Sequence, residues 1–178
     1  MNIRNAELSD AERIALIHAE SWRNTYRGIL SDEFLDGAVR DERRSFWQKR
    51  MAEPGPEKRL ILLACEKKEV LGFLCLYLDA DGRWGALLDN LHIVPGVRGR
   101  GFGRMLMSRS AAWVLQQRPG SGMYLWVYEQ NFEARGFYEK LGGLQGETLL
   151  KRTVEGKQVP TLRYVWRDLH ALADSIRS

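Results

Sequence analysis

The sequence predicts an α/β (α+β) fold, with helices on both faces of a mixed, mostly antiparallel sheet of six to seven strands. Apolar residues recur at helical spacing over roughly the first fifty residues and then change to strand-like runs. Short polar turns separate most of these runs, which favours antiparallel pairing. A chain of 178 residues, 44% of them hydrophobic, is the size of one domain. We therefore expect a single domain over residues 1–178.

Breaker residues and helix caps set the predicted element boundaries. Ser9 and Glu12 have the spacing of a capping box at the start of the first helix. Ser31 caps a second helical region, which Gly37 divides, and a Pro/Gly cluster at 53–56 ends the helical part. In chain order, we expect a strand over 2–6, helices over 10–22 and 32–51, strands over 60–65, 70–78 and 86–94, a helix over 102–117, a strand over 123–128, a helix over 131–141, and strands over 148–154 and 159–167.

Composition excludes several classes of function. The net charge is +4 and the isoelectric point is near 9.2, which favours anionic partners only mildly. No aromatic residues are interleaved on a basic stripe, so we expect no nucleic-acid partner. Cys65 and Cys75 lack CxxC spacing and the three histidines lack metal-ligand spacing, so we expect no metal. No apolar run approaches the roughly 18 residues that span a membrane, which predicts a cytoplasmic protein without membrane contact.

The loop Arg98-Gly99-Arg100-Gly101-Phe102-Gly103 is the strongest sequence feature, because it follows a predicted strand and opens a predicted helix. Glycine amides in such a loop can converge on an anion, with the positive end of the helix behind them. The Walker pattern fails because Arg104 follows Gly103 where lysine is required. The dinucleotide pattern fails because position 104 is not glycine and no acidic residue occurs at 123–127.

The remaining pattern is R-x-x-G-x-G on Arg98, Gly101 and Gly103, followed by Asn-x-x-Ala-x-x-Phe-Tyr at 131–138. In order and spacing, this stretch from Leu88 to Gly143 resembles the GNAT superfamily of N-acetyltransferases. The resemblance implies a GNAT-like fold, acetyl-CoA as co-substrate and direct transfer to a primary amine of a small molecule or a peptide N-terminus.

The resemblance also implies where acetyl-CoA binds. The backbone of Leu91 and Ile93, with His92 between them, would pair with the pantetheine arm, and an amide there would polarise the thioester carbonyl. Asn131 would bond the pantetheine region, although it equally fits a helix cap, and Phe137 belongs to the same motif. The residues expected at the pyrophosphate are Arg98, Gly99, Arg100, Gly101, Phe102, Gly103 and Arg104.

Catalysis is expected to depend on Tyr138, which matches the family tyrosine near the departing sulfur. A buried helical stripe is the alternative role for this residue. Because tyrosine titrates near 10 and a thiol near 8.5, a hydrogen bond to the thiolate is favoured over full proton transfer. Leu87 stands where the family often has a glutamate base. Asp89 is the nearest carboxylate on the strand and is either the base, acting through water, or a structural residue, with Glu20 as a weaker candidate.

The acceptor site in the family is walled by the first helices, which here contain Glu20, Trp22 and Tyr26. Aromatic rings beside a carboxylate suit a cationic amine, although the same residues could equally pack between elements in the hydrophobic core. The missing glutamate at Leu87 motivates a second hypothesis, that the chain is a catalytically weak CoA-binding sensor or interaction module. The family's frequent dimers make a homodimer possible.

Overall fold

The computed structural model describes residues 1–53 and 56–175, so Pro54 and Gly55 of the predicted breaker cluster lie outside the described residues. The chain forms two compact units, and each is described by itself. The first unit comprises Met1–Cys75 and Asn90–Leu106, and the second comprises Leu76–Asp89 and Met107–Ser178.

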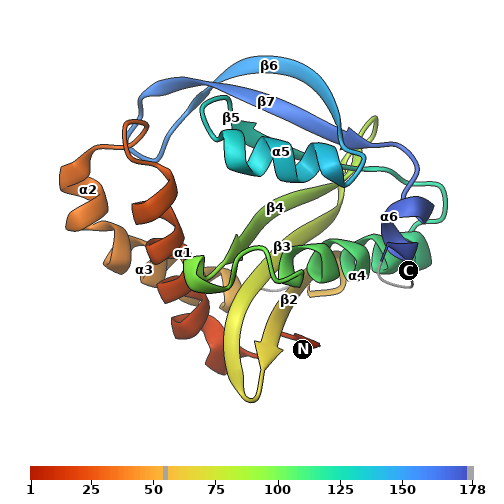
Figure 1. The fold of residues 1–178 in the computed structure, drawn as a ribbon, viewed down its shortest axis with the longest axis horizontal. Coiled ribbons are helices and arrows are strands. Elements are labelled where there is room, and N and C mark those ends of the chain that lie inside the picture. The colour runs from red at the N-terminus through yellow and green to blue at the C-terminus, as the bar shows by residue number, and fades with distance from the viewer. Residues whose placement is uncertain (54–55, 176–178) are drawn as a thin grey trace. The chain divides into compact units, whose positions relative to one another are not determined.

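The described elements follow the predicted order of a strand, helices, three strands, and then alternating helices and strands (Figure 1). They are β1 Asn2–Asn5, α1 Ala11–Thr25, α2 Asp32–Asp36, α3 Val39–Ala52, β2 Arg59–Glu66, β3 Glu69–Asp81, β4 Gly85–Ile93, α4 Phe102–Gln117, β5 Met123–Tyr128, α5 Phe132–Lys140, β6 Leu144–Arg152, β7 Gln158–Trp166 and α6 His170–Asp174, with short 3-10 turns η1 Leu8–Asp10, η2 Pro56–Lys58 and η3 Pro95–Val97. Hydrogen bonds join the strands into a mixed seven-stranded sheet in the order β1-β2-β3-β4-β5-β7-β6. The predicted α/β class with a mixed sheet is therefore confirmed.

The first unit contains the three N-terminal helices, which Figure 1 shows grouped together in red and orange. Trp47 of α3 and Phe73 of β3 are fully buried beside the apolar stripe of α1. The Ser31 hydroxyl accepts a hydrogen bond from Phe34 N–H at 3.1 Å, so the predicted cap of α2 is confirmed. Helix α3 begins after Gly37, which divides the helical region as predicted.

The predicted capping box of Ser9 and Glu12 is wrong. Helix α1 begins at Ala11 after the N-cap Asp10, and Ser9 lies in η1. The Glu12 carboxylate instead accepts two hydrogen bonds of 2.8 Å from Arg44 of α3. Glu12 therefore ties α1 to α3 and does not reach back to the helix start.

The second unit is built on an antiparallel ladder that pairs all of β5 with β7. A short parallel ladder joins Ala86–Leu88 of β4 to Met123–Leu125. Helix α5 packs on β7, and a Cβ at Gly143 would lie 2.6 Å from Cζ2 of Trp166, so glycine there permits the close approach. β6 begins at Leu144 rather than at the predicted residue 148, because a bulge after Gln145 lets the strand continue. Helix α6 was not predicted.

Candidate functional site

The glycine loop lies in the first unit, where it follows β4 and opens α4. Gly99 and Gly101 have φ angles of +78° and +90°, which other residues rarely adopt. A Cβ at either position would meet nothing within 4 Å, so glycine is required by conformation and the space beside the loop is open. The Met105 N–H donates to the Gly101 carbonyl at 3.0 Å as α4 begins. The preceding amides of the first turn have no intrahelical acceptor, which suits an anion.

Two of the loop arginines are held by side chains of the same unit. Arg98 is half-buried and donates to the hydroxyl of Thr25, at the end of α1, at 3.3 Å. Arg100 donates to both carboxylate oxygens of Glu66, at the end of β2, at 2.8 and 2.9 Å. Arg104, in the first turn of α4, is exposed. Pairing with Glu66 reduces the positive charge that Arg100 offers to an anion.

His92, on β4, faces two side chains of α1. Its Nδ1 lies 2.8 Å from the Ser21 hydroxyl oxygen, and its ring centroid lies 4.3 Å from that of His18. His18 is fully buried, and its Nδ1 accepts a hydrogen bond from Nε1 of Trp47 at 2.9 Å. Burial, followed by the charges of two arginines, lowers the pKa of His92 to about 3, and burial also holds the pKa of His18 well below its ordinary value. Both rings are therefore neutral at neutral pH.

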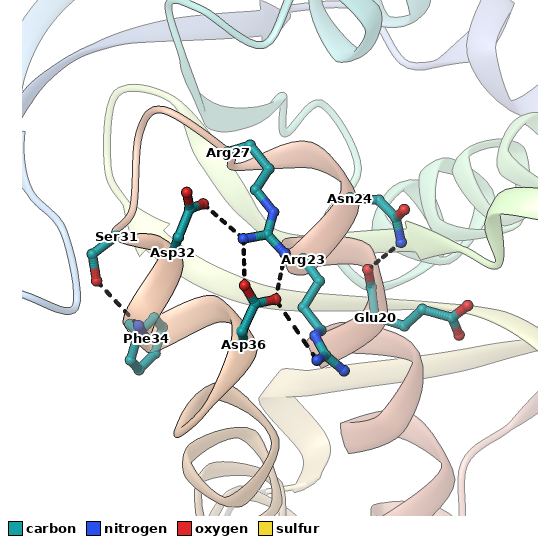
Figure 2. Close-up of polar contacts among 8 residues, drawn as sticks. All are labelled: Glu20, Arg23, Asn24, Arg27, Ser31, Asp32, Phe34 and Asp36. Atoms are coloured by element: carbon teal, nitrogen blue, oxygen red, sulfur yellow. Dashed lines mark hydrogen bonds and ion pairs between the residues drawn. The ribbon is translucent and has the colours of Figure 1, made fainter.

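An ion-pair network holds the turn between α1 and α2. Arg27 donates to Asp32 at 2.7 Å and to Asp36 at 2.9 Å, and Arg23 lies 3.8 Å from Asp36. Figure 2 shows the Glu20 side chain pointing away from this network, and Glu20 is exposed. The network fixes the turn without using the Glu20 carboxylate.

Trp22 lies in the last turn of α1 and Tyr26 is the C-cap residue of that helix, and their ring centroids are 5.5 Å apart. Cζ of Arg43, on α3, lies 4.2 Å from the Trp22 ring centroid. Glu20 precedes Trp22 by two residues and so lies about 200° around the helix from it. The structure thus brings the two predicted aromatic residues together beside a cation and places Glu20 on another side of α1.

Asn131 and Tyr138 lie in the second unit, Asn131 as the N-cap residue of α5 and Tyr138 within that helix. Oδ1 of Asn131 accepts a hydrogen bond from Ala134 N–H at 3.2 Å, which caps the helix. Tyr138 is only 8% exposed, and its ring centroid lies 5.4 Å from that of Phe137 and 6.0 Å from that of Trp166. Burial alone raises the pKa of the Tyr138 hydroxyl above its usual value of 10. The hydroxyl therefore stays protonated and can donate a hydrogen bond.

Asp89 is exposed on the part of β4 that belongs to the second unit. Burial, followed by the charges of Asp81 and Asp89, raises the pKa of Tyr124, and the charge of Arg163 opposes this change. Leu87 lies opposite Tyr124 in the parallel ladder, and residues two apart on a strand share a face. Trp166 directly follows Val165, the partner of Tyr124 on β7, so its side chain points to the other face of the sheet. Tyr138 packs against Trp166 on that other face. Asp89 and Tyr138 thus lie on opposite faces of the sheet.

Sequence reasoning missed a group of cations and aromatic rings on the face that carries Asp89. Trp126 and Arg163 are direct partners in the β5–β7 ladder. The alternation of aromatic with aliphatic residues along β5 was the available signal. It could not identify Arg163, because only the strand register brings β7 beside β5. We call this group the Arg163 cluster, and it consists of Trp84, Tyr124, Trp126, Lys151 and Arg163.

Two general properties apply to residues 1–53 and 56–175. Within them, no group of three or more His, Cys, Asp or Glu side chains is placed to hold a metal ion. In the same part of the chain, no helix combines the length and the apolar character needed to cross a membrane.

Comparison with known proteins gives the family context. The sequence profile described as "Acetyltransferase (GNAT) family" matches residues 18–143. The chain is 31% identical to the peptidyl-lysine N-acetyltransferase YjaB of Salmonella typhimurium over 142 residues, covering 80% of this chain and 82% of that protein. It is 30% identical to the uncharacterized N-acetyltransferase YuaI of Bacillus subtilis over 134 residues, covering 74% and 73%.

A solved structure shares the fold. The PaiA N-acetyltransferase of Thermoplasma acidophilum, crystallised in complex with coenzyme A, superposes with a TM-score of 0.70. The match covers 93% of this chain and 98% of that chain, at 22% sequence identity. At this identity the likeness establishes the fold.

Proposed function

This chain belongs to the acetyltransferase (GNAT) family and uses acetyl-CoA, and we propose that it passes the acetyl group to a primary amine by direct attack in a ternary complex. The acceptor is a small molecule or a peptide N-terminus. The observation that carries the proposal is the glycine loop, in which Gly99 and Gly101 hold positive φ angles directly before the free amides of α4. One domain over residues 1–178 remains our prediction for the organisation of the chain.

The loop residues fit the pyrophosphate of acetyl-CoA. Arg98 and Arg104 supply charge, and the first-turn amides of α4, from Phe102 onward, supply donors. Gly99 and Gly101 leave open space beside the backbone. When bound, acetyl-CoA supplies an acyl group on a thioester whose sulfur leaves as a thiolate.

We assign the binding of the pantetheine arm to the backbone of β4 and to Asn131. Backbone groups at Leu91 and Ile93 pair with the arm, and one of these amides stabilises the charge that develops on the thioester oxygen. Asn131 uses Oδ1 for the helix cap, so its Nδ2 is the group that serves the cofactor.

Tyr138 donates a hydrogen bond to the departing sulfur. Because burial raises its pKa, full transfer of the phenolic proton to a thiolate is further uphill than for an ordinary tyrosine. We therefore assign Tyr138 as a hydrogen-bond donor. Phe137 packs beside it and restricts its ring.

Because Asp89 and Tyr138 lie on opposite faces of the sheet, we propose that the amine approaches the thioester from the Asp89 face while the sulfur departs on the Tyr138 face. Asp89 then accepts, through a water molecule, the proton that the ammonium acceptor must lose. Its exposure supports this role, because an exposed carboxylate can return the proton to solvent. Leu87, two residues earlier on the same face of β4, has no titratable group. Glu20 is the weaker alternative, because it lies on α1 away from the aromatic pair of Trp22 and Tyr26.

The experiment that tests the proposal is an acceptor screen with acetyl-CoA. Thiol release is followed over polyamines, amino acids, aminoglycosides and peptide N-termini. The proposal expects at least one amine to raise the rate well above the hydrolytic background. Tight acetyl-CoA binding with no amine-dependent release would instead favour a CoA-binding sensor, the alternative motivated by Leu87.

We also propose a cytoplasmic homodimer with no nucleic-acid or membrane partner. β6 is an edge strand of the sheet and is exposed along most of its length. Its side chains at the surface include Leu144, Leu149 and Leu150. An uncovered edge strand with apolar side chains is a common pairing surface. Light scattering at micromolar concentration would give the mass of a dimer if this is correct and of a monomer if it is not.

A further inference from the structure

The Arg163 cluster lies within the second unit, on the sheet face that carries Asp89. Cζ of Arg163 lies 4.5 Å from the ring centroid of Trp126 and 4.6 Å from that of Trp84. The Tyr124 ring centroid lies 5.4 Å away. The guanidinium is therefore contacted by three aromatic rings, two of them on β5 and one in the turn before β4.

Arg163 has more donors than the described residues satisfy. Its side chain is 9% exposed, and Nη2 lies 2.7 Å from Oε1 of Glu147. Nε and Nη1 are buried and have no hydrogen-bond partner among residues 1–53 and 56–175. A buried donor without an acceptor is costly, and the guanidinium cannot shed its charge to reduce that cost. The two donors therefore indicate a site for oxygen acceptors.

A second cation shares the same indole. Nζ of Lys151 lies 3.9 Å from the ring centroid of Trp126. Burial and the charge of Arg163 lower the pKa of Lys151, while Asp89 opposes this change. Two cations that contact one ring repel each other, and an anion bound beside them would reduce that repulsion.

A cationic ligand fits this surface poorly, although aromatic rings and carboxylates are both present. Positive side chains already contact the rings, because Arg83 also lies 4.5 Å from the Trp84 centroid. The Glu147 carboxylate is engaged by Arg163. An ammonium group would add charge of the same sign and could not accept from Nε or Nη1 of Arg163.

We propose that the Arg163 cluster binds a carboxylate on the acceptor, so that the substrate is an amine that also carries a carboxylate, as a free amino acid does. The inference rests on the proposed function and names the substrate class for that same site. Arg163 and Lys151 bind the carboxylate, and the amine is directed along the same face toward Asp89. Polyamines and aminoglycosides, which lack a carboxylate, are excluded as preferred acceptors.

Two measurements test this inference. The first compares thiol release with amino acids and with their carboxamides, at saturating acetyl-CoA, in the wild-type enzyme. We expect kcat/KM to be about ten- to a hundred-fold higher for the carboxylates, the range for loss of a charge-assisted hydrogen bond. Equal or higher values for the carboxamides or for polyamines would overturn the inference while leaving the proposed acetyl transfer intact.

The second measurement needs no turnover. N-acetyl-amino acids and their carboxamides are titrated while the intrinsic fluorescence of the protein is recorded, to which Trp84 and Trp126 contribute among six tryptophans. We expect saturable binding of the carboxylates only, weakened at least ten-fold in Lys151→Gln and in Arg163→Gln. Arg167→Gln is the matched control, because Arg167 is exposed and its Cζ lies 5.8 Å from the same Trp84 ring. Lys151→Gln keeps the test decisive if Arg163→Gln fails to fold, and carboxylate binding unchanged in Lys151→Gln would overturn the inference.

Discussion

Lowering the pH from 7 to 5 should destabilise the folded protein through His18 and His92. In the folded state Nδ1 of His18 accepts a hydrogen bond from Nε1 of Trp47. Protonation of Nδ1 would place its N–H opposite the N–H of Trp47 and break that bond. Burial lowers the pKa of His92 to about 3 and keeps that of His18 well below 6.5. In the unfolded chain both titrate near 6.5. Below that pH the unfolded state binds protons that the folded state does not, so stability falls as pH falls.

The expected size follows from the difference in bound protons. Each histidine that stays neutral in the folded state reduces the free energy of unfolding by about 2 kcal/mol between pH 7 and pH 5. The two together give about 4 kcal/mol, a large share of the 5–15 kcal/mol of an ordinary domain. Asp10, Glu12 and Asp36 have lowered pKa values in the folded state, so their contribution is lost mainly below about pH 4.5. The window from pH 7 to pH 5 therefore isolates the histidines.

Urea unfolding, followed by far-UV circular dichroism at pH 7, 6 and 5, measures this loss. His92→Gln should retain about half of the pH dependence, because Gln can still bond Ser21 but does not titrate. His170→Gln is the control, since His170 is exposed on α6 and its loss should leave the slope unchanged. A free energy of unfolding that is constant from pH 7 to pH 5, or a His92→Gln slope equal to wild type, would refute the reasoning.

Three further predictions concern the proposed cofactor site. Tyr138→Phe should lower kcat about a hundred-fold, as loss of a transition-state donor does, with the acetyl-CoA Kd within two-fold of wild type; unchanged turnover would remove Tyr138 from the mechanism. Gly101→Ala should raise the acetyl-CoA Kd about ten-fold by calorimetry, since a positive φ costs a side chain about 1–2 kcal/mol. Gly96→Ala, in open space without positive φ, should not change it, and equal effects would contradict the conformational argument. Asn131→Ser should keep the cap but weaken acetyl-CoA binding, whereas Asn131→Ala should also cost about 1 kcal/mol of stability; Ser binding as tightly as Asn would leave capping as the sole role.

Local signals in the sequence were sufficient where glycine and proline mark the boundaries. α4 spans Phe102–Gln117 and β5 spans Met123–Tyr128, as predicted, because glycines precede α4 and a Pro/Gly segment at 119–122 separates the two elements. The cofactor site could be predicted from the loop between Arg98 and Gly103, because the glycines and arginines that would bind the anion are adjacent in sequence. Helix and strand periodicity then gave the order of the remaining elements.

Long-range partners explain most of what sequence reasoning missed. Glu12 had the spacing of a capping box, but Arg44 lies 32 residues later and competes for its carboxylate in the folded protein. The Arg163 cluster depends on the register that sets Arg163 opposite Trp126, which no local pattern encodes. Glu20 and Trp22 are only two residues apart in sequence, yet the rotation of the helix places them on different sides of α1.

The central claim is that the acetyl group moves from acetyl-CoA to an amine. The most direct measurement uses acetyl-CoA labelled with carbon-13 in the acetyl group, with mass spectrometry of the acceptor and titration of the released thiol. We predict one labelled acetyl group per thiol released, on the amine nitrogen, with the rate strongly reduced in Tyr138→Phe. Thiol release that leaves every amine unlabelled would contradict the claim and show that the bound cofactor is only hydrolysed.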